Sequence, residues 1–164
     1  TLPLTLFPYT TLFRSGRPQL LNLKDLIHHF VNHRHDVVVK RTTFELKKAE
    51  QRAHILEGLI IASDNIDDVI LLIKKSSNAE EARLKLEKKY KLSETQAKAI
   101  IEMRLRQLTG LEQSKLREEY DDLQKTIKSY KELLDSKPMR MNLIKDELSD
   151  IKEKYGDERR SVIE

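Results

Sequence analysis

Apolar residues at heptad spacing run through the second half of the chain, and this pattern constrains the fold more than any other feature. The positions step by four and three residues, with one interruption at Lys137. This period of about 3.5 residues predicts a helix whose apolar seam packs against a partner helix in a coiled coil. At about 1.5 Å per residue the arm would be roughly 60 Å long. The seam consists of Leu116, Tyr120, Leu123, Ile127, Tyr130, Leu134, Met141, Ile144, Leu148, Ile151 and Tyr155.

A second, weaker heptad pattern lies earlier in the chain and supplies a partner for the first. Pairing the two stripes in opposite directions places Ala53 near Leu123 and Ala49 near Ile127, and small residues opposite large ones favour close helix packing. The sequence therefore predicts an antiparallel hairpin of two long helices within one chain. The alternative is that each stripe pairs with a second chain. The members of the earlier stripe are Val39, Thr42, Leu46, Ala49, Ala53, Leu56 and Ile60.

The composition favours an all-α fold. No proline lies between Pro18 and Pro138, and charged residues make up 35% of the 164 residues. We find no segment with the period-two alternation of a half-buried strand. Cysteine is absent, which excludes disulfides and thiolate metal sites and fits a cytoplasmic protein. No apolar run approaches the length of a membrane span, and a thin hairpin buries too little surface to form an enzyme pocket by itself.

These patterns divide the chain into six segments. Residues 1–15 carry a single charge, contain two prolines and lack the basic start of a signal peptide, so we interpret them as a translated sequencing adaptor or a disordered tail. The other segments are a base helix at 16–35, a descending arm at 36–62, a helical head at 63–110, an ascending arm at 111–156 and an exit segment at 157–164.

The head is predicted to contain three short helices. We expect Asn65 to cap the first, while Asn78 with Glu81, and Ser93 with Gln96, have the spacing of capping boxes for the other two. The third helix carries apolar residues on more than one face. A head of this size cannot cover such a helix alone, so either the arms or a second copy of the head must do so.

Two local features are expected to interrupt the arms. Gly58 lies inside the first arm, where glycine costs roughly 1 kcal/mol relative to alanine, and it marks either the close approach of another helix or no particular role. The Ser136-Lys137-Pro138 sequence predicts a kink or a short break in the second arm. Gly156 is expected to end that arm.

Few residues suggest catalysis. Tyr120, Tyr130 and Tyr155 fall on the heptad positions, which predicts packing residues rather than nucleophiles. His29 and His33 lie one helical turn apart, but without an HExxH pattern or a thiolate they indicate a basic, partly exposed face rather than a metal site. The sequence contains no glycine-rich phosphate loop.

Basic residues gather along the first arm and are candidates for contact with phosphate groups. The net charge is +4. We identify no aromatic residue interleaved with these cations, so we expect any DNA contact to be to the backbone and indifferent to base sequence. The candidates are Arg34, Lys40, Arg41, Lys47, Lys48 and Arg52.

Three stretches of the sequence are more specific than the patterns that generic coiled coils share. They read HRHDVVVKRTTFELKKAEQRAHILEGL at 33–59, QAKAIIEMRLRQLTGLE at 96–112 and ELSDIKEKYGDERRS at 147–161. Taken together, they closely resemble the A subunits of the type IIA topoisomerases, and DNA gyrase more than topoisomerase IV. The resemblance covers nearly all of residues 17–164. Two small departures are His35-Asp36, where the family tends to have a basic residue followed by glutamate, and Ser161, where threonine is more usual.

The resemblance implies one part of an ATP-dependent enzyme that introduces negative supercoils by double-strand breakage and strand passage. This part would be the coiled-coil arm and the dimeric exit gate, without the catalytic tyrosine, which the family carries upstream. The corresponding part of topoisomerase IV and a non-enzymatic antiparallel coiled-coil adaptor are the alternatives.

The resemblance also implies partners and contact residues. The partners are a second copy of the chain, the B subunit of gyrase and double-stranded DNA. The full enzyme would use Mg²⁺ and ATP through its partner subunit, whereas this segment is expected to hold no metal or cofactor. The implied dimer contacts are Ile100, Ile101, Met103, Arg104, Leu105, Gln107, Leu108 and Thr109.

Overall fold

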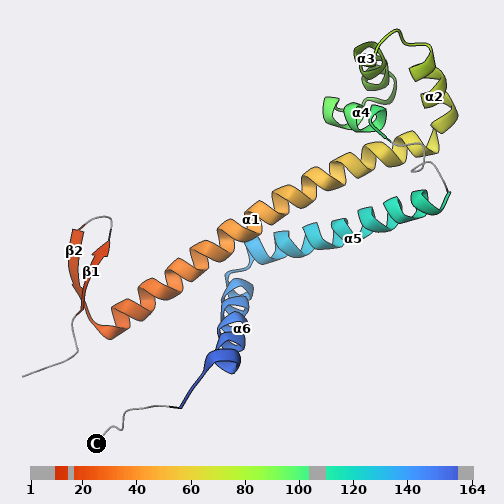
Figure 1. Cartoon of the computed structure of the whole chain (residues 1–164). Helices are drawn as coiled ribbons and strands as arrows, with labels where there is room; N and C mark the ends of the chain where they lie inside the picture. The colour runs from red at the N-terminus through yellow and green to blue at the C-terminus, as the bar shows by residue number, and fades with distance from the viewer. Residues whose placement is uncertain (1–9, 15–16, 104–109, 159–164) are drawn as a thin grey trace, which may run out of the picture. The chain divides into compact units, whose positions relative to one another are not determined.

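The computed structural model describes residues 10–14, 17–103 and 110–158, and this part of the chain is almost entirely helical (Figure 1). The all-α prediction is confirmed, with one short β-hairpin near the N-terminus as an addition. The elements are β1 (Thr10–Arg14), β2 (Arg17–Leu21), α1 (Leu23–Asp64), α2 (Ile66–Lys74), α3 (Ala79–Tyr90), α4 (Glu94–Ile101), α5 (Gly110–Asp135) and α6 (Lys137–Tyr155).

The chain divides into two compact units, and α1 contributes to both. One unit contains residues 43–132, and the other contains residues 1–42 with residues 133–164. Among the described residues, no helix is at once long enough and apolar enough to span a membrane.

In the unit formed by residues 43–132, α1 and α5 lie side by side in opposite directions (Figure 1). Ala49 and Ala53 of α1 and Ile127 of α5 form a buried cluster, and Leu123 packs against it. The alanines leave room for the larger Ile127 and Leu123 side chains opposite. The predicted pairing within one chain is therefore confirmed.

Three ion pairs between α1 and α5 lie beside this seam. Glu50 pairs with Lys131 at 2.9 Å, Arg52 pairs with Glu119 at 2.8 Å, and Asp64 pairs with Arg117. All six side chains are between 42% and 56% exposed, so each pair contributes little stability but favours this register.

Helices α2, α3 and α4 form the head and share a core with the end of α1. The core combines side chains from four helices, because each short helix has too little surface to bury its apolar face alone. Its fully buried members are Leu56, Leu59, Ala62, Val69, Leu86, Leu92, Ala97 and Ile100.

The helix starts of the head match the predicted caps in two cases out of three. Ser93 and Gln96 form a complete capping box at α4. At α3, Asn78 Oδ1 accepts a hydrogen bond from Glu81 N at 2.8 Å, while the Glu81 carboxylate accepts from Ser77 N rather than from Asn78 N. The prediction for Asn65 was wrong, since its side chain makes no cap hydrogen bond to α2.

In the other unit, residues predicted as the start of a base helix form a strand instead. Strands β1 and β2 pair in antiparallel register from Thr10 with Leu21 to Arg14 with Arg17. Helix α1 begins at Leu23, where the apolar helical pattern starts, and Asn22 caps it, since Asn22 Oδ1 accepts a hydrogen bond from Asp25 N at 2.9 Å.

The predicted break in the second arm is confirmed. Helix α5 ends at Asp135, and Ser136 caps α6 by accepting a hydrogen bond from Met139 N at 3.4 Å. Arg140 crosses the break: it donates to Leu133 O at 3.1 Å and to Leu134 O, and its Nε donates to His35 Nε2 at 3.0 Å.

The heptad seam does not remain covered to its end. Ile144 is buried, but Ile151 is 50% exposed and Tyr155 is 80% exposed. The prediction that Tyr155 is a packing residue was wrong for the chain by itself. The seam ends where α6 approaches Gly156, which forms the expected C-cap by donating to Lys152 O at 2.8 Å.

Candidate functional site

The six predicted phosphate-contacting cations fall into two groups of three. The first group is the arginines, which are already engaged within the chain. Arg34 and Arg41 both bind Glu147, at 2.6 and 2.5 Å, and Arg52 binds both carboxylate oxygens of Glu119 at 2.8 and 3.0 Å. These guanidinium groups connect helices and would have to release a carboxylate before they could contact a phosphate.

The charge state of these pairs follows from their geometry. The hydrogen bond from Arg41, followed by the positive charges of Arg41 and Arg34, lowers the pKa of Glu147 despite partial burial. The hydrogen bond to Glu119 raises the pKa of Arg52. Both contacts therefore favour the charged forms and stabilise the helix pairing rather than a binding site.

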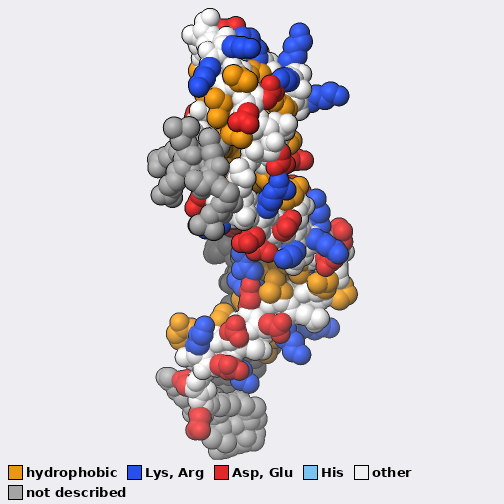
Figure 2. Space-filling model, turned by 90° about the vertical axis from the view of Figure 1, so that its right-hand side faces the viewer, with side chains coloured by type: hydrophobic (Ala, Val, Ile, Leu, Met, Phe, Trp, Pro, Cys, Tyr) orange, Lys and Arg blue, Asp and Glu red, His pale blue; other side chains and the backbone are white. Residues whose placement is uncertain are grey.

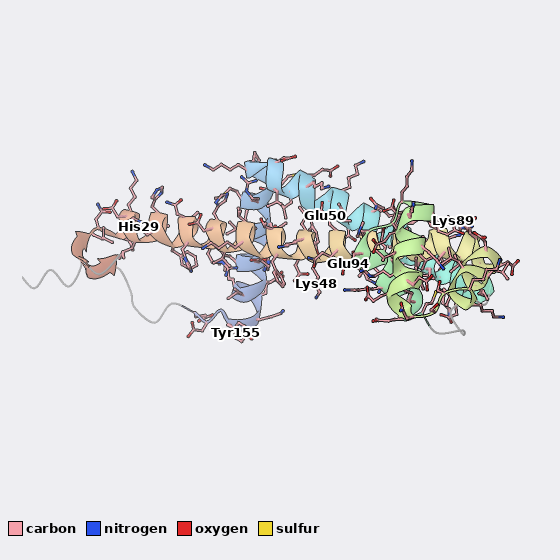
Figure 3. All side chains as sticks on the ribbon, turned by 90° about the horizontal axis from the view of Figure 1, so that it is seen from above. His29, Lys48, Glu50, Lys89, Glu94 and Tyr155 are labelled. Carbon is pink, nitrogen blue, oxygen red and sulfur yellow. The ribbon has the colours of Figure 1, made fainter. Side chains whose placement is uncertain are left out.

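The second group is the lysines, which are exposed and available. Lys40, Lys47 and Lys48 are exposed on α1, and none of them forms an ion pair with another described residue. Figure 3 shows Lys48 and Glu50 on different sides of α1, with Glu50 on the side of α5. The three ammonium groups are therefore exposed and are not held in an ion pair within the described part of the chain.

An exposed aromatic residue, overlooked in the sequence, lies among these lysines. Phe44 is 64% exposed and precedes Lys47 and Lys48 by three and four residues on α1, which places the three side chains on one helix face. The statement that no aromatic residue interleaves with the cations was wrong. The sequence did indicate its exposure, because Phe44 lies on a different face of the helix from Thr42 and Leu46 of the heptad stripe.

Unlike the exposed Tyr155, the other two tyrosines of the heptad seam, Tyr120 and Tyr130, lie against residues of the arm. Tyr120 packs against the buried residues of the arm and of the head. Tyr130 lines a shallow groove of about 230 Å³ together with Lys48, Arg52 and Leu123. Among the described residues, neither phenol forms a hydrogen bond with a carboxylate or an imidazole, which agrees with a packing role for both residues.

A serine–histidine pair in the head serves a structural purpose. His54 Nε2 lies 2.7 Å from Ser93 Oγ, and the Gln96 side chain donates to the His54 carbonyl at 2.8 Å. Because Ser93 Oγ also accepts the hydrogen bond from Gln96 N, it is the N-cap of α4. The contact attaches the start of α4 to α1 and does not activate a nucleophile. Among the described residues, no three His, Cys, Asp or Glu side chains are grouped so that they could hold a metal ion.

The predicted dimer contacts lie at and beyond the end of α4. Ile100 is 2% exposed and belongs to the core of the head, so its apolar character is accounted for within one chain. Ile101 and Met103 are partly buried against the same core. The remaining residues of this prediction lie outside the described part of the chain: Arg104, Leu105, Gln107, Leu108 and Thr109.

On the face drawn in Figure 2, the surface charge is mixed rather than separated by sign. Lys and Arg side chains alternate there with Asp and Glu side chains. Local clusters such as the Phe44–Lys47–Lys48 face therefore carry more information about binding than the net charge of +4 does.

Comparison with protein families gives a match over most of the chain. The family described as the A subunit of DNA gyrase/topoisomerase IV matches residues 6–149. The match includes ten of the fifteen residues interpreted above as an adaptor or a disordered tail, and the origin of residues 1–15 remains a prediction.

Individual relatives agree with this family match. The chain is 50% identical to the DNA gyrase A subunit of Clostridium acetobutylicum over 149 residues, which is 91% of this chain and 18% of the relative. It is 48% identical to the DNA gyrase A subunits of Staphylococcus epidermidis and Streptococcus pneumoniae, over 92% of this chain and 17% and 18% of those proteins. The chain thus spans less than a fifth of the length of these relatives.

Proposed function

Because this chain belongs to the family of DNA gyrase and topoisomerase IV A subunits, we propose that it forms the coiled-coil arm and the exit-gate head of a DNA gyrase. The observation that carries the proposal is the antiparallel pairing of α1 with α5 around Ala49, Ala53 and Ile127, together with a helical head that packs on the end of α1. A topoisomerase IV is the alternative, since the family includes both enzymes, and the gyrase assignment is supported by the named relatives.

In this proposal the arm is a spacer and the head is a contact surface. The paired part of the arm is stiff because its seam is packed, and movement concentrates at the break around Ser136, where only a short link joins α5 to α6. Two heads would meet through the same patch on each chain, which is the geometry of a two-fold dimer. The free energy of this contact must be modest, because a gate has to open and close again.

The proposed DNA contact of the arm uses the available lysines. Lys40, Lys47 and Lys48 would hold the phosphate backbone of a passing duplex by charge. Such contacts carry no sequence information, which suits an enzyme that must pass any segment of DNA.

The chemistry of breakage and of ATP use is assigned to other parts of the enzyme. In the proposal, the full enzyme uses Mg²⁺ and ATP through the B subunit of gyrase, and its catalytic tyrosine lies upstream of this region. The described residues do not fit either group, since they offer no acidic cluster for a metal and no glycine-rich phosphate loop. In this proposal the role of the region is mechanical, and its proposed location is the cytoplasm.

The dimer contact is the part of the proposal that an experiment tests most easily. We expect the chain to sediment as a dimer and Leu105→Glu to sediment as a monomer, because the substitution would place an unpaired charge in the contact. Leu84→Glu is the matched control, since Leu84 is 57% exposed on α3 and should leave the dimer intact. A monomeric parent chain, or a dimer that Leu105→Glu does not weaken, would contradict the proposed exit-gate contact.

A further inference from the structure

The most unusual surface residue of the arm is Phe44. Its side chain is 64% exposed, and Lys47 and Lys48 follow it on the same face. The other large apolar side chains exposed on α1 lie near its start, at Leu23, Ile27 and Phe30. We propose that this face binds single-stranded DNA, with an unpaired base stacked on the Phe44 ring and the neighbouring phosphates held by Lys47 and Lys48. The inference rests on the proposed DNA contact of the arm and adds to it a ligand class and a residue.

The packing of the arm does not explain Phe44. The seam of α1 consists of Thr42, Ala49 and Ala53, which are buried, and Phe44 lies about half a helical turn away from them. An exposed aromatic ring on a charged helix adds nothing to the pairing of α1 with α5. A binding role would account for it.

The chemistry of the face fits a nucleic acid strand with unpaired bases. The two lysines lie one helical turn beyond the ring, at a rise of about 4.5 to 6 Å along α1. A single strand presents alternating bases and phosphates, so one base can stack on the ring while phosphates contact the ammonium groups. Every base has an aromatic face, and the contact would therefore be indifferent to sequence.

A DNA duplex could contact the two lysines of this face but not the Phe44 ring. Its bases are stacked inside the double helix and its phosphates lie outside, so a convex helix reaches the phosphates and not the base faces. The lysines would contribute to both ligands, whereas Phe44 would contribute to the single strand alone. This difference allows the role of Phe44 to be separated from the general DNA contact.

The absence of tryptophan from the sequence gives a direct probe of stacking. Phe44→Trp places the only tryptophan of the chain at the proposed contact, and we expect an oligo(dT) single strand to quench its fluorescence while a duplex of equal length does not. Phe30→Trp is the matched control, because Phe30 is 50% exposed on the same helix but has no lysine one turn away, and Arg34, which is one turn away, is bound to Glu147. Its fluorescence should not change with either ligand.

Binding of the full 164-residue chain then measures the contribution of each residue. We expect Phe44→Ala to weaken oligo(dT) binding about tenfold, without changing the salt dependence or the duplex affinity. Lys47→Gln and Lys48→Gln should weaken both ligands, and each should reduce the salt slope for the single strand by about 0.7. Because Phe44 is exposed, Phe44→Ala should leave the melting temperature unchanged.

The outcomes separate this inference from the proposed function. If the lysine variants lose DNA but Phe44→Ala binds oligo(dT) like the parent chain, the stacking contact is refuted and the backbone contact stands. If neither DNA form binds, both proposals fail. If an oligoglutamate peptide binds with the same dependence on Phe44, the face recognises acidic protein segments, and the inference is overturned.

Discussion

Gly58 of α1 lies directly against Gln96 of α4, and a Cβ atom built at position 58 would stand 2.7 Å from Gln96 Cβ. No side chain fits between the two helices at this point. The glycine thus marks a close helix approach, which was one of the two interpretations of the sequence. It also allows the Gln96 side chain to reach the His54 carbonyl, so that α4 is attached to α1 beside its own N-cap.

Gly58→Ala should destabilise the chain, although alanine is the better helix former by roughly 1 kcal/mol. The overlap involves the base of the Gln96 side chain rather than its flexible end, so relief requires a shift of α4. We expect a net loss of about 1–3 kcal/mol in thermal or urea unfolding followed by circular dichroism. Glu57→Ala, at the exposed neighbouring position, is the control, and an equal or higher stability for Gly58→Ala would refute the close contact.

Ala53→Leu tests the small-against-large packing of the arm. Ala53 is 4% exposed beside Ile127, so three additional carbon atoms must displace that side chain or enter the groove of about 270 Å³ that both residues line. The free energy of unfolding should fall by about 1–3 kcal/mol, measured by urea denaturation. Ala79→Leu adds the same atoms at an exposed position of α3 and should change stability little. Tolerance of leucine at position 53 would show that α1 and α5 are not closely packed.

Glu147→Gln should change how stability depends on pH. Arg41 and Arg34 lower the pKa of Glu147 from 4.5, so its contribution to stability is fully present above that value and is lost as the pH falls through the lowered folded-state pKa. The variant should be less stable by about 1 kcal/mol at neutral pH and should lose less stability on acidification. Thermal melts between neutral and acidic pH measure both effects. If the melting temperatures of the two proteins change with pH in parallel, the Glu147 carboxylate is not bound by Arg34 and Arg41.

Tyr90→Phe should act at the alkaline end of the pH range. Burial, followed by the hydrogen bond from its hydroxyl to Asp68, raises the pKa of Tyr90 to about 12. Its contribution to stability is therefore present below about pH 10, the value of an unfolded tyrosine, and is lost as the pH rises towards 12.

A titration of phenolate absorbance should show a late step in the parent chain that Tyr90→Phe removes. Tyr155→Phe is the control and should leave the late step in place, because Tyr155 makes no such contact and is 80% exposed. If the late absorbance step persists in Tyr90→Phe, that step belongs to another tyrosine.

The helix pairing was predictable because heptad spacing and residue size are local properties of the sequence. Ala53 opposite Leu123 and the break at Ser136 both follow from such patterns, and the structure confirms them. Asn65 shows where this reasoning fails. A single residue separates α1 from α2, so the Asn65 side chain turns back and donates to the Ile61 carbonyl of α1 at 2.9 Å.

The candidate surfaces were harder to predict because they depend on contacts between distant residues. Nothing in the sequence near Arg52 indicates that Glu119 engages it, and the same holds for Arg34 and Glu147. Apolar spacing in α4 also could not separate a core residue from a contact residue, and Ile100 is a core residue of its own head.

The intrachain pairing of α1 with α5 can be tested by a single disulfide, because the chain contains no cysteine. Ala53→Cys with Leu123→Cys should oxidise to a monomer with an internal crosslink, visible on non-reducing gels as one faster-migrating band that slows on reduction. Phe44→Cys with Leu123→Cys, which places one thiol on the outer face of α1, should not form that band. Covalent dimers as the main product of the Ala53→Cys, Leu123→Cys chain would instead show that the two stripes pair between chains, and the arm described here would not exist.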